Sequence, residues 1–304
     1  STSGGRSKNP SSLALRPRAR HRRNRGKERT LHLFMSSCCP TGALPASYAE
    51  KGTSFTPAGE TIDLGGGCRC YATGDPRWKT AIVVMHDVFG LDGGHHRALC
   101  DALAAGGHYV VCPDFYQGGS IEPYYKNGAA DEGKEWLKRF NWAWCSAILE
   151  RVYAHLDGKG VTSTGSIGFC WGAWAVAKAC QDPKRVQAGV WCHPSCQVGR
   201  ELYEGETEHE LAQRVRSPTL ILPSPQEPEL YRNGELAAIF KANGIASEME
   251  YFHDQSHGWM TRGAGFLGKS WFDSGGRENL TSMIGVQRGV NLTLGWFAKH
   301  LHHK

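Results

Sequence analysis

The sequence lacks any apolar run approaching the roughly 20 residues that a membrane-spanning helix needs. It also has no paired C-x2-C units at zinc spacing, no glycine-rich phosphate loop, no nucleotide fingerprint and no internal repeat. These absences argue against an integral membrane protein, a zinc module, a nucleotide-binding protein and a repeat array. We therefore expect no membrane association, no cofactor and no metal.

Acidic residues are scarce at the start of the chain. Residues 1–34 hold ten Lys or Arg and one acid, Glu28, which gives +9, so the remainder carries −3 of the formal net charge of +6. The mildly acidic remainder gives no sign of a nucleic-acid surface. We expect residues 1–48 to be a disordered basic leader, followed by one domain over residues 49–304.

Three origins fit the composition of this leader. It is Arg- and Ser-rich, as in a transit peptide to a chloroplast or mitochondrion. Translation upstream of Met35, or an alternative start there, and a tail that binds polyanions are the other two. The expected location is cytoplasmic, or organellar if the leader is a transit peptide.

The cysteines form no recognisable framework. There are 11, an odd number, and without a secretory signal their scatter indicates a reducing compartment. The spacings of Cys68-x-Cys70 and Cys192-x3-Cys196 do not complete a zinc site. The neighbours Cys38 and Cys39 are either a redox-sensitive tip or, the favoured interpretation, an unstructured pair without a role.

What the chain has in quantity is short apolar strands separated by helical segments. Strands without polar alternation, alternating with helices, predict a mostly parallel sheet covered on both faces, an α/β fold. The expected strands lie at about residues 60–72 (one or two edge strands with a turn at residues 65–67), 81–86, 109–112, 166–169, 188–191, 219–222 and 247–252. The expected helices lie at about residues 96–105, 135–156, 171–181, 233–243 and 287–300, and residues 117–134 look like a loop.

The stretch Ser166 to Ala173 ends an apolar strand at Cys170, which has glycines two residues before and two after it. This is the pattern of a nucleophile elbow, where a strand turns sharply into a helix. Small residues after Cys170 let that helix lie close to the sheet, and its positive end favours a thiolate and an oxyanion. Alone, the pattern also fits a buried structural cysteine.

A base and an acid follow in the order that α/β-hydrolases use. Glu227 follows the strand near residue 222, and His257 lies in the loop after the next strand. Cysteine catalysis needs a base to accept the thiol proton and a third group to orient that base. We predict a triad of Cys170, His257 and Glu227, with Glu229 as the substitute acid.

Together these motifs resemble the dienelactone hydrolase family, a branch of the α/β-hydrolases. The matching segments run in family order across about residues 50–302. They are His86 to Gly90 (H-D-V-F-G), Pro113 to Tyr116 (P-D-F-Y), Gly168 to Gly172 (G-F-C-W-G), the strand leading to Gln226-Glu227, and His257 to Arg262 (H-G-W-x-x-R). Before them, Cys38 to Pro40 (C-C-P) resembles the start of many eukaryotic members.

The resemblance implies a cysteine-dependent, carboxymethylenebutenolidase-like hydrolase of small lactones or esters, acting through a thioester. Cys170 is then the nucleophile, His257 the base, and Glu227 the acid where the family usually has aspartate. The backbone N–H groups of Val88 and Trp171 would form the oxyanion hole.

Two further residues are implied in substrate binding or gating. Asp87 stands where bacterial members carry a gating glutamate; otherwise it caps the following helix. Arg262 stands where a family arginine receives a substrate carboxylate; otherwise it is a structural arginine. We expect a monomer or weak homodimer.

The glutamate at position 227, the basic leader and a long Gly-rich segment over residues 263–285 keep one alternative open. In it the chain is a catalytically weak or inactive binding or assembly protein on the same fold.

Overall fold

The computed structural model describes residues 39, 43–44, 55–203, 205–263 and 277–302. The predicted leader, residues 1–48, lies outside these residues except for positions 39, 43 and 44. Most of the Gly-rich segment, residues 264–276, also lies outside them.

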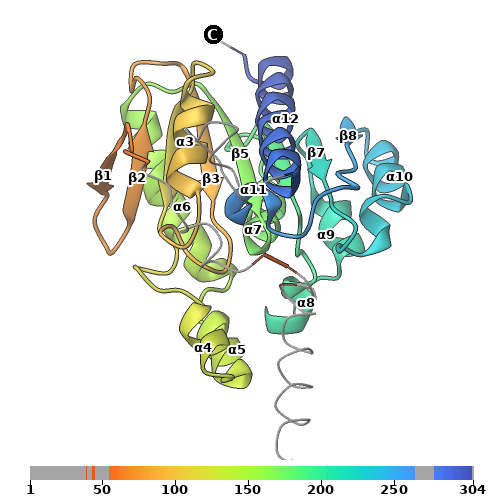
Figure 1. Ribbon diagram of the computed structural model, residues 1–304. Coiled ribbons are helices and arrows are strands. Elements are labelled where there is room, and N and C mark those ends of the chain that lie inside the picture. Colours follow the sequence, from red (N-terminus) through yellow and green to blue (C-terminus); the bar gives the residue numbers. More distant parts are fainter. Residues whose placement is uncertain (1–38, 40–42, 45–54, 204, 264–276, 303–304) are drawn as a thin grey trace, which may run out of the picture.

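Within the described residues the chain folds around one eight-stranded sheet (Figure 1). The strands are β1 (Glu60–Asp63), β2 (Arg69–Thr73), β3 (Thr80–Met85), β4 (Tyr109–Pro113), β5 (Ser163–Phe169), β6 (Ala188–Cys192), β7 (Thr219–Leu222) and β8 (Ser247–Met249). Their order is β1-β2-β4-β3-β5-β6-β7-β8. The β1–β2 and β2–β4 pairs are antiparallel, and all other pairs are parallel. The parallel strands place their carboxyl ends at one edge, where open α/β sheets bind ligands.

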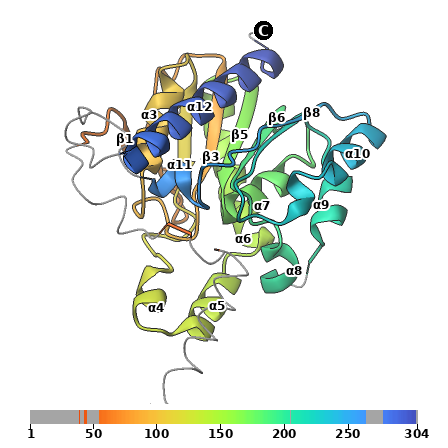
Figure 2. The same ribbon diagram turned by 45° about the vertical axis from the view of Figure 1, so that its right-hand side comes forward.

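Helices cover both faces of the sheet (Figure 2). Helices α3 (His96–Ala104), α11 (Trp259–Arg262) and α12 (Arg277–His300) lie on one face. Helices α6 (Trp142–Gly158), α7 (Trp171–Ala179), α9 (Glu208–Arg214) and α10 (Glu235–Ala242) lie on the other, and α4 (Glu122–Lys126), α5 (Ala130–Lys138) and α8 (Val198–Tyr203) lie beyond the carboxyl edge. One short helix, η1 (Glu229–Tyr231), follows β7.

Strand β3 shows why two cores form. Ile82 and Val84 pack with α3 and α12, whereas Ala81, Val83 and Met85 pack with α6 and α7. Successive side chains of a strand point to opposite faces, so a strand that is apolar throughout is buried on both sides. The predicted α/β-hydrolase architecture is confirmed.

Several element boundaries differ from the sequence prediction. Residues 117–134 are not only loop, because they hold α4 and the start of α5. The single helix expected over residues 135–156 is wrong: it is two helices, α5 and α6, separated near Asn141, whose side chain caps α6 by accepting from the Trp144 N–H. Strand β8 is shorter than expected, and α12 begins at Arg277, so part of the Gly-rich segment is helical.

None of the described helices is long and apolar enough to span a bilayer.

Candidate active site

Cys170 occupies a strained turn between β5 and α7. Its φ of 54° and ψ of −116° lie in a region that residues with a side chain rarely adopt. A Cβ at Gly168 would overlap the Gly172 carbonyl, and one at Gly172 would overlap the carbonyls of Met85 and His86. The two glycines therefore permit the close approach of helix and strand that the elbow needs.

The structure brings the three predicted triad side chains together at the carboxyl edge of the sheet. The Cys170 sulfur lies within 4.8 Å of a ring nitrogen of His257. On the other side of the ring, Nδ1 of His257 lies 2.6 Å from Glu227 Oε1. Because Glu227 holds Nδ1, Nε2 is the nitrogen left to receive the thiol proton.

Both loops that carry His257 and Glu227 are fixed by further hydrogen bonds. The Ser224 hydroxyl donates to Glu227 Oε1 at 3.1 Å, and the Ser224 N–H donates to Oε2. The His257 N–H donates to Gln226 Oε1 at 2.5 Å. Gly258, with φ of 86°, turns the chain from His257 directly into α11. Of the two candidate acids, Glu227 is the one that the structure brings to His257.

The electrostatics of this cluster favour a protonated imidazole. Burial alone would lower the pKa of His257, but charge and hydrogen bonding from Cys170 and Glu227 outweigh it and raise the pKa to about 9. A thiolate and an imidazolium that stabilise each other are the reactive pair of cysteine nucleophiles.

Asp87 and Arg262 form a buried ion pair beside this cluster. The Asp87 carboxylate also accepts from the Thr261 hydroxyl at 2.8 Å and from the Phe89 N–H at 2.9 Å. Burial would raise the pKa of Asp87, but Arg262 and His96 outweigh it and lower the pKa. Helix α3 has no side-chain cap at its N-terminus, so Asp87 orders its own loop rather than capping that helix.

Arg262 is fully buried, with its guanidinium carbon 4.7 Å from the Phe89 ring centre. Its Nε donates to the Leu44 carbonyl at 2.6 Å. Its Nη2 has no hydrogen-bond partner among the described residues.

Val88 lies in the loop after β3, and Trp171 follows the nucleophile at the first position of α7. Within the described residues, neither backbone N–H donates to a backbone carbonyl. Both amides are buried with their side chains. These two amides are therefore the candidates for the pair of donors that an oxyanion hole requires.

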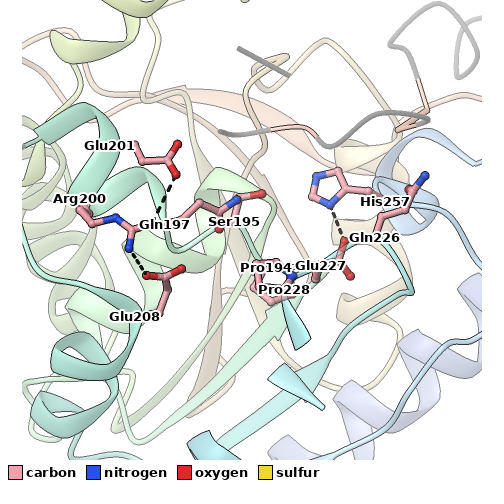
Figure 3. Close-up of a pocket in the computed structure, with 10 residues that line it drawn as sticks. All are labelled: Pro194, Ser195, Gln197, Arg200, Glu201, Glu208, Gln226, Glu227, Pro228 and His257. Carbon is pink, nitrogen blue, oxygen red and sulfur yellow. Dashed lines mark hydrogen bonds and ion pairs between the residues drawn. The ribbon is translucent and has the colours of Figure 1, made fainter. Parts of the chain in front are cut away.

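A pocket of about 490 Å³ opens next to the triad (Figure 3). His257 and Glu227 form one wall, and Arg200 lies opposite, between Glu201 and Glu208. Ser195 lines the pocket and places its Oγ 3.5 Å from the Cys170 sulfur. Cys170 itself is fully buried.

Three residues near the nucleophile were missed by the sequence analysis. The Cys39 sulfur lies 3.8 Å from that of Cys170, and Leu44 N–H donates to the His257 carbonyl at 3.0 Å. His193, at φ 35°, packs its ring 5.1 Å from that of His257. The available signal was weak: His193 directly follows an apolar strand beside the elbow strand, and Cys39 belongs to the Cys-Cys pair to which no role was given.

The sheet, the elbow and the order of the three side chains define an α/β-hydrolase. Residues 69–278 match the model of the dienelactone hydrolase family, so the chain belongs to that family. The chain is therefore a hydrolase, and its family is one of carboxylic ester hydrolases.

Individual relatives are distant. The chain is 29% identical over 240 residues to an uncharacterized AIM2 family protein of Schizosaccharomyces pombe, covering 74% of this chain and 88% of that one. It is 25% identical over 186 residues to a carboxymethylenebutenolidase homolog of Rattus norvegicus, covering 60% and 71%. Among solved structures, a dienelactone hydrolase-like promiscuous phosphotriesterase from metagenomic libraries superposes with a TM-score of 0.55 at 17% identity, covering 80% and 98%. That last likeness shows the shared fold.

Proposed function

We propose that the chain hydrolyses small lactones or esters with Cys170 as nucleophile, His257 as base and Glu227 as the acid that orients His257. One observation carries the proposal. A cysteine held at a strained elbow lies within 4.8 Å of an imidazole nitrogen, and the other nitrogen of that ring is bound by a buried carboxylate. The rat relative named a carboxymethylenebutenolidase homolog supports a lactone substrate.

The reaction has two halves. The Cys170 thiolate attacks the carbonyl carbon, the N–H groups of Val88 and Trp171 stabilise the resulting oxyanion, and the departing alkoxide takes a proton from His257. Water then gives a proton to His257 and attacks the thioester, which releases the carboxylic acid and regenerates the Cys170 thiolate beside the His257 imidazolium. In a lactone the departing alkoxide stays attached to the acyl group, so ring opening leaves one product.

Arg262 and Asp87 are proposed to bind and to gate. Arg262 Nη2 would donate to a carboxylate on the substrate, a role that suits the planar guanidinium. Asp87 forms the ion pair that holds Arg262 in place. The carboxylate of a bound substrate would compete with Asp87 for the Arg262 guanidinium and would so weaken that ion pair.

The direct test replaces Cys170 with alanine. We expect turnover of p-nitrophenyl acetate and of a dienelactone to disappear, and iodoacetamide to label Cys170 of the wild type ahead of the other ten cysteines. A purified Cys170→Ala protein with undiminished turnover would remove the proposal. If iodoacetamide labelled all cysteines at the same rate, the result would favour the binding or assembly role.

A further inference from the structure

Two thiols and an imidazole converge at the buried end of the candidate site. The Cys39 and Cys170 sulfurs are 3.8 Å apart, and the ligand atoms of Cys39, Cys170 and His257 all lie within 4.8 Å of one another. All three side chains are buried. Among the residues that the structure describes, no other group of three His, Cys, Asp or Glu side chains gathers its ligand atoms this closely.

These separations fit a tetrahedral metal ion with soft ligands. Two Zn–S bonds of about 2.3 Å at a tetrahedral angle place their sulfurs about 3.8 Å apart. A Zn–N bond of about 2.0–2.1 Å then places the nitrogen about 3.6 Å from each sulfur. Two touching thiols also lie near 3.8 Å, so the imidazole within reach of both sulfurs is what distinguishes a metal site from a sulfur contact. Side-chain rotation can close the remaining gap.

The surroundings of the three ligands resemble those of zinc-binding histidines. Such a histidine usually donates its second ring nitrogen to a carboxylate, as His257 Nδ1 does to Glu227 at 2.6 Å. Asp87 neutralises the charge of the nearby Arg262 guanidinium, so this guanidinium does not repel a bound Zn²⁺ ion. The neighbouring pocket supplies a route inward, lined by the carboxylates of Glu201 and Glu208.

We propose that Cys39, Cys170 and His257 form an inhibitory Zn²⁺ site, with water from the pocket as the fourth ligand. The inhibitory effect rests on the proposed function, because two of the ligands are the proposed nucleophile and base. On binding, Zn²⁺ displaces two protons to solvent, one from the Cys39 thiol and one shared by the Cys170–His257 pair, and bonds to two thiolates and a neutral imidazole. Neither Cys170 nor His257 can then react, and a chelator restores both.

Cys39 is the residue that tests this proposal, because it provides a ligand and has no part in the proposed reaction. Metal binding is measured on the full chain with a non-chelating reductant, by Zn²⁺ competition against a chromophoric chelator and by Co²⁺ absorption. Wild type should bind one equivalent and give the charge-transfer band of thiolate-bound Co²⁺. Cys39→Ala should weaken Zn²⁺ binding at least about a hundredfold and weaken Zn²⁺ inhibition of ester hydrolysis by the same factor.

Cys68→Ala is the matched control. Cys68 and Cys70 are another buried sulfur pair, 3.7 Å apart, and this variant should bind Zn²⁺ as the wild type does. Unchanged affinity in Cys39→Ala, or loss of the bound equivalent in Cys68→Ala, would overturn the metal site. Binding is read separately from turnover, so the two proposals can fail independently. If wild type binds no Zn²⁺ and Cys170→Ala is inactive, the zinc site is refuted and the proposed mechanism stands. If Zn²⁺ binding depends on Cys39 but Cys170→Ala is fully active, the proposed mechanism is refuted, and the inhibitory effect of Zn²⁺ is refuted with it.

Discussion

At the scale of single residues, the contact between Glu227 and His257 shows how a longer acid is accommodated. The resemblance leads one to expect aspartate at position 227, and glutamate places its carboxylate one methylene further out. Ser224 holds that carboxylate by its N–H and its hydroxyl, and Glu227 Oε1 still reaches Nδ1 at 2.6 Å. The loop after β7 thus compensates for the extra length.

Two substitutions at this position separate charge from reach. Glu227→Gln keeps the length but removes a negative charge that raises the pKa of His257, so the imidazolium should lose its proton at lower pH. The fall in kcat/KM on the alkaline side, expected near pH 9 in wild type, should therefore move to lower pH. Glu227→Asp keeps the charge but shortens the reach. We expect roughly 10²- to 10⁴-fold lower kcat for both variants, measured as pH–rate profiles. An alkaline limb that stays in place in Glu227→Gln would show that Glu227 does not act on His257.

The same scale marks the limit of sequence reasoning. Cys170, Glu227 and His257 could be predicted because each follows a recognisable strand, and parallel strands bring their carboxyl ends together. Cys39 could not, since it lies 131 positions from Cys170 and outside any regular element. Arg262 could be singled out from its position in the H-G-W-x-x-R segment. Its buried ion pair with Asp87 could not, because that pair depends on the paths of two separate loops.

At the scale of elements, the junction of β5 and α7 leaves no room for a side chain. Gly172→Ala would press a methyl group into the carbonyls of Met85 and His86, and backbone atoms cannot move away as a flexible side chain can. We expect a loss of about 1–3 kcal/mol or more in the free energy of unfolding, together with a displaced Cys170. Gly295→Ala, within α12 and with nothing near the added methyl group, should instead gain about 0.5–1 kcal/mol. Urea unfolding of both variants checks the pair, and equal effects would refute a packing constraint specific to the elbow.

Helix boundaries were the part of the fold that periodicity predicted least well. A run of aromatic residues suggested one helix over residues 135–156, yet the chain leaves the helix after α5 and restarts at Asn141. The rings of Trp136 in α5 and of Phe140 just after it contact the Tyr116 ring, which ties the end of α5 to the loop after β4. These contacts join residues far apart in sequence, so a local pattern does not reveal them. For the buried strands, whose apolar runs are short and bounded, the predicted boundaries lie much closer to the observed ones.

At the scale of the whole molecule, the Asp87–Arg262 pair joins three parts of the chain. Asp87 follows β3, Arg262 ends α11, and Leu44 accepts from Arg262 Nε. The pair therefore brings Leu44, the loop after β3 and the end of α11 together at one point beside the nucleophile. Breaking it has consequences beyond the site, because the partner left behind is a buried charge.

Asp87→Asn should lower the free energy of unfolding by about 3–5 kcal/mol, since Arg262 then stays buried without its counterion. The lowered pKa of Asp87 means that its stabilising effect is present above the unfolded-state value of 3.8 and is lost as the pH falls through the folded-state value. The difference between wild type and Asp87→Asn should therefore be widest near neutral pH and shrink in acid, as urea unfolding at several pH values would show. Asp87→Asn/Arg262→Met, which removes both charges, should be less destabilised than Asp87→Asn. If the double variant were the less stable of the two, the buried charge would not be the cause of the loss.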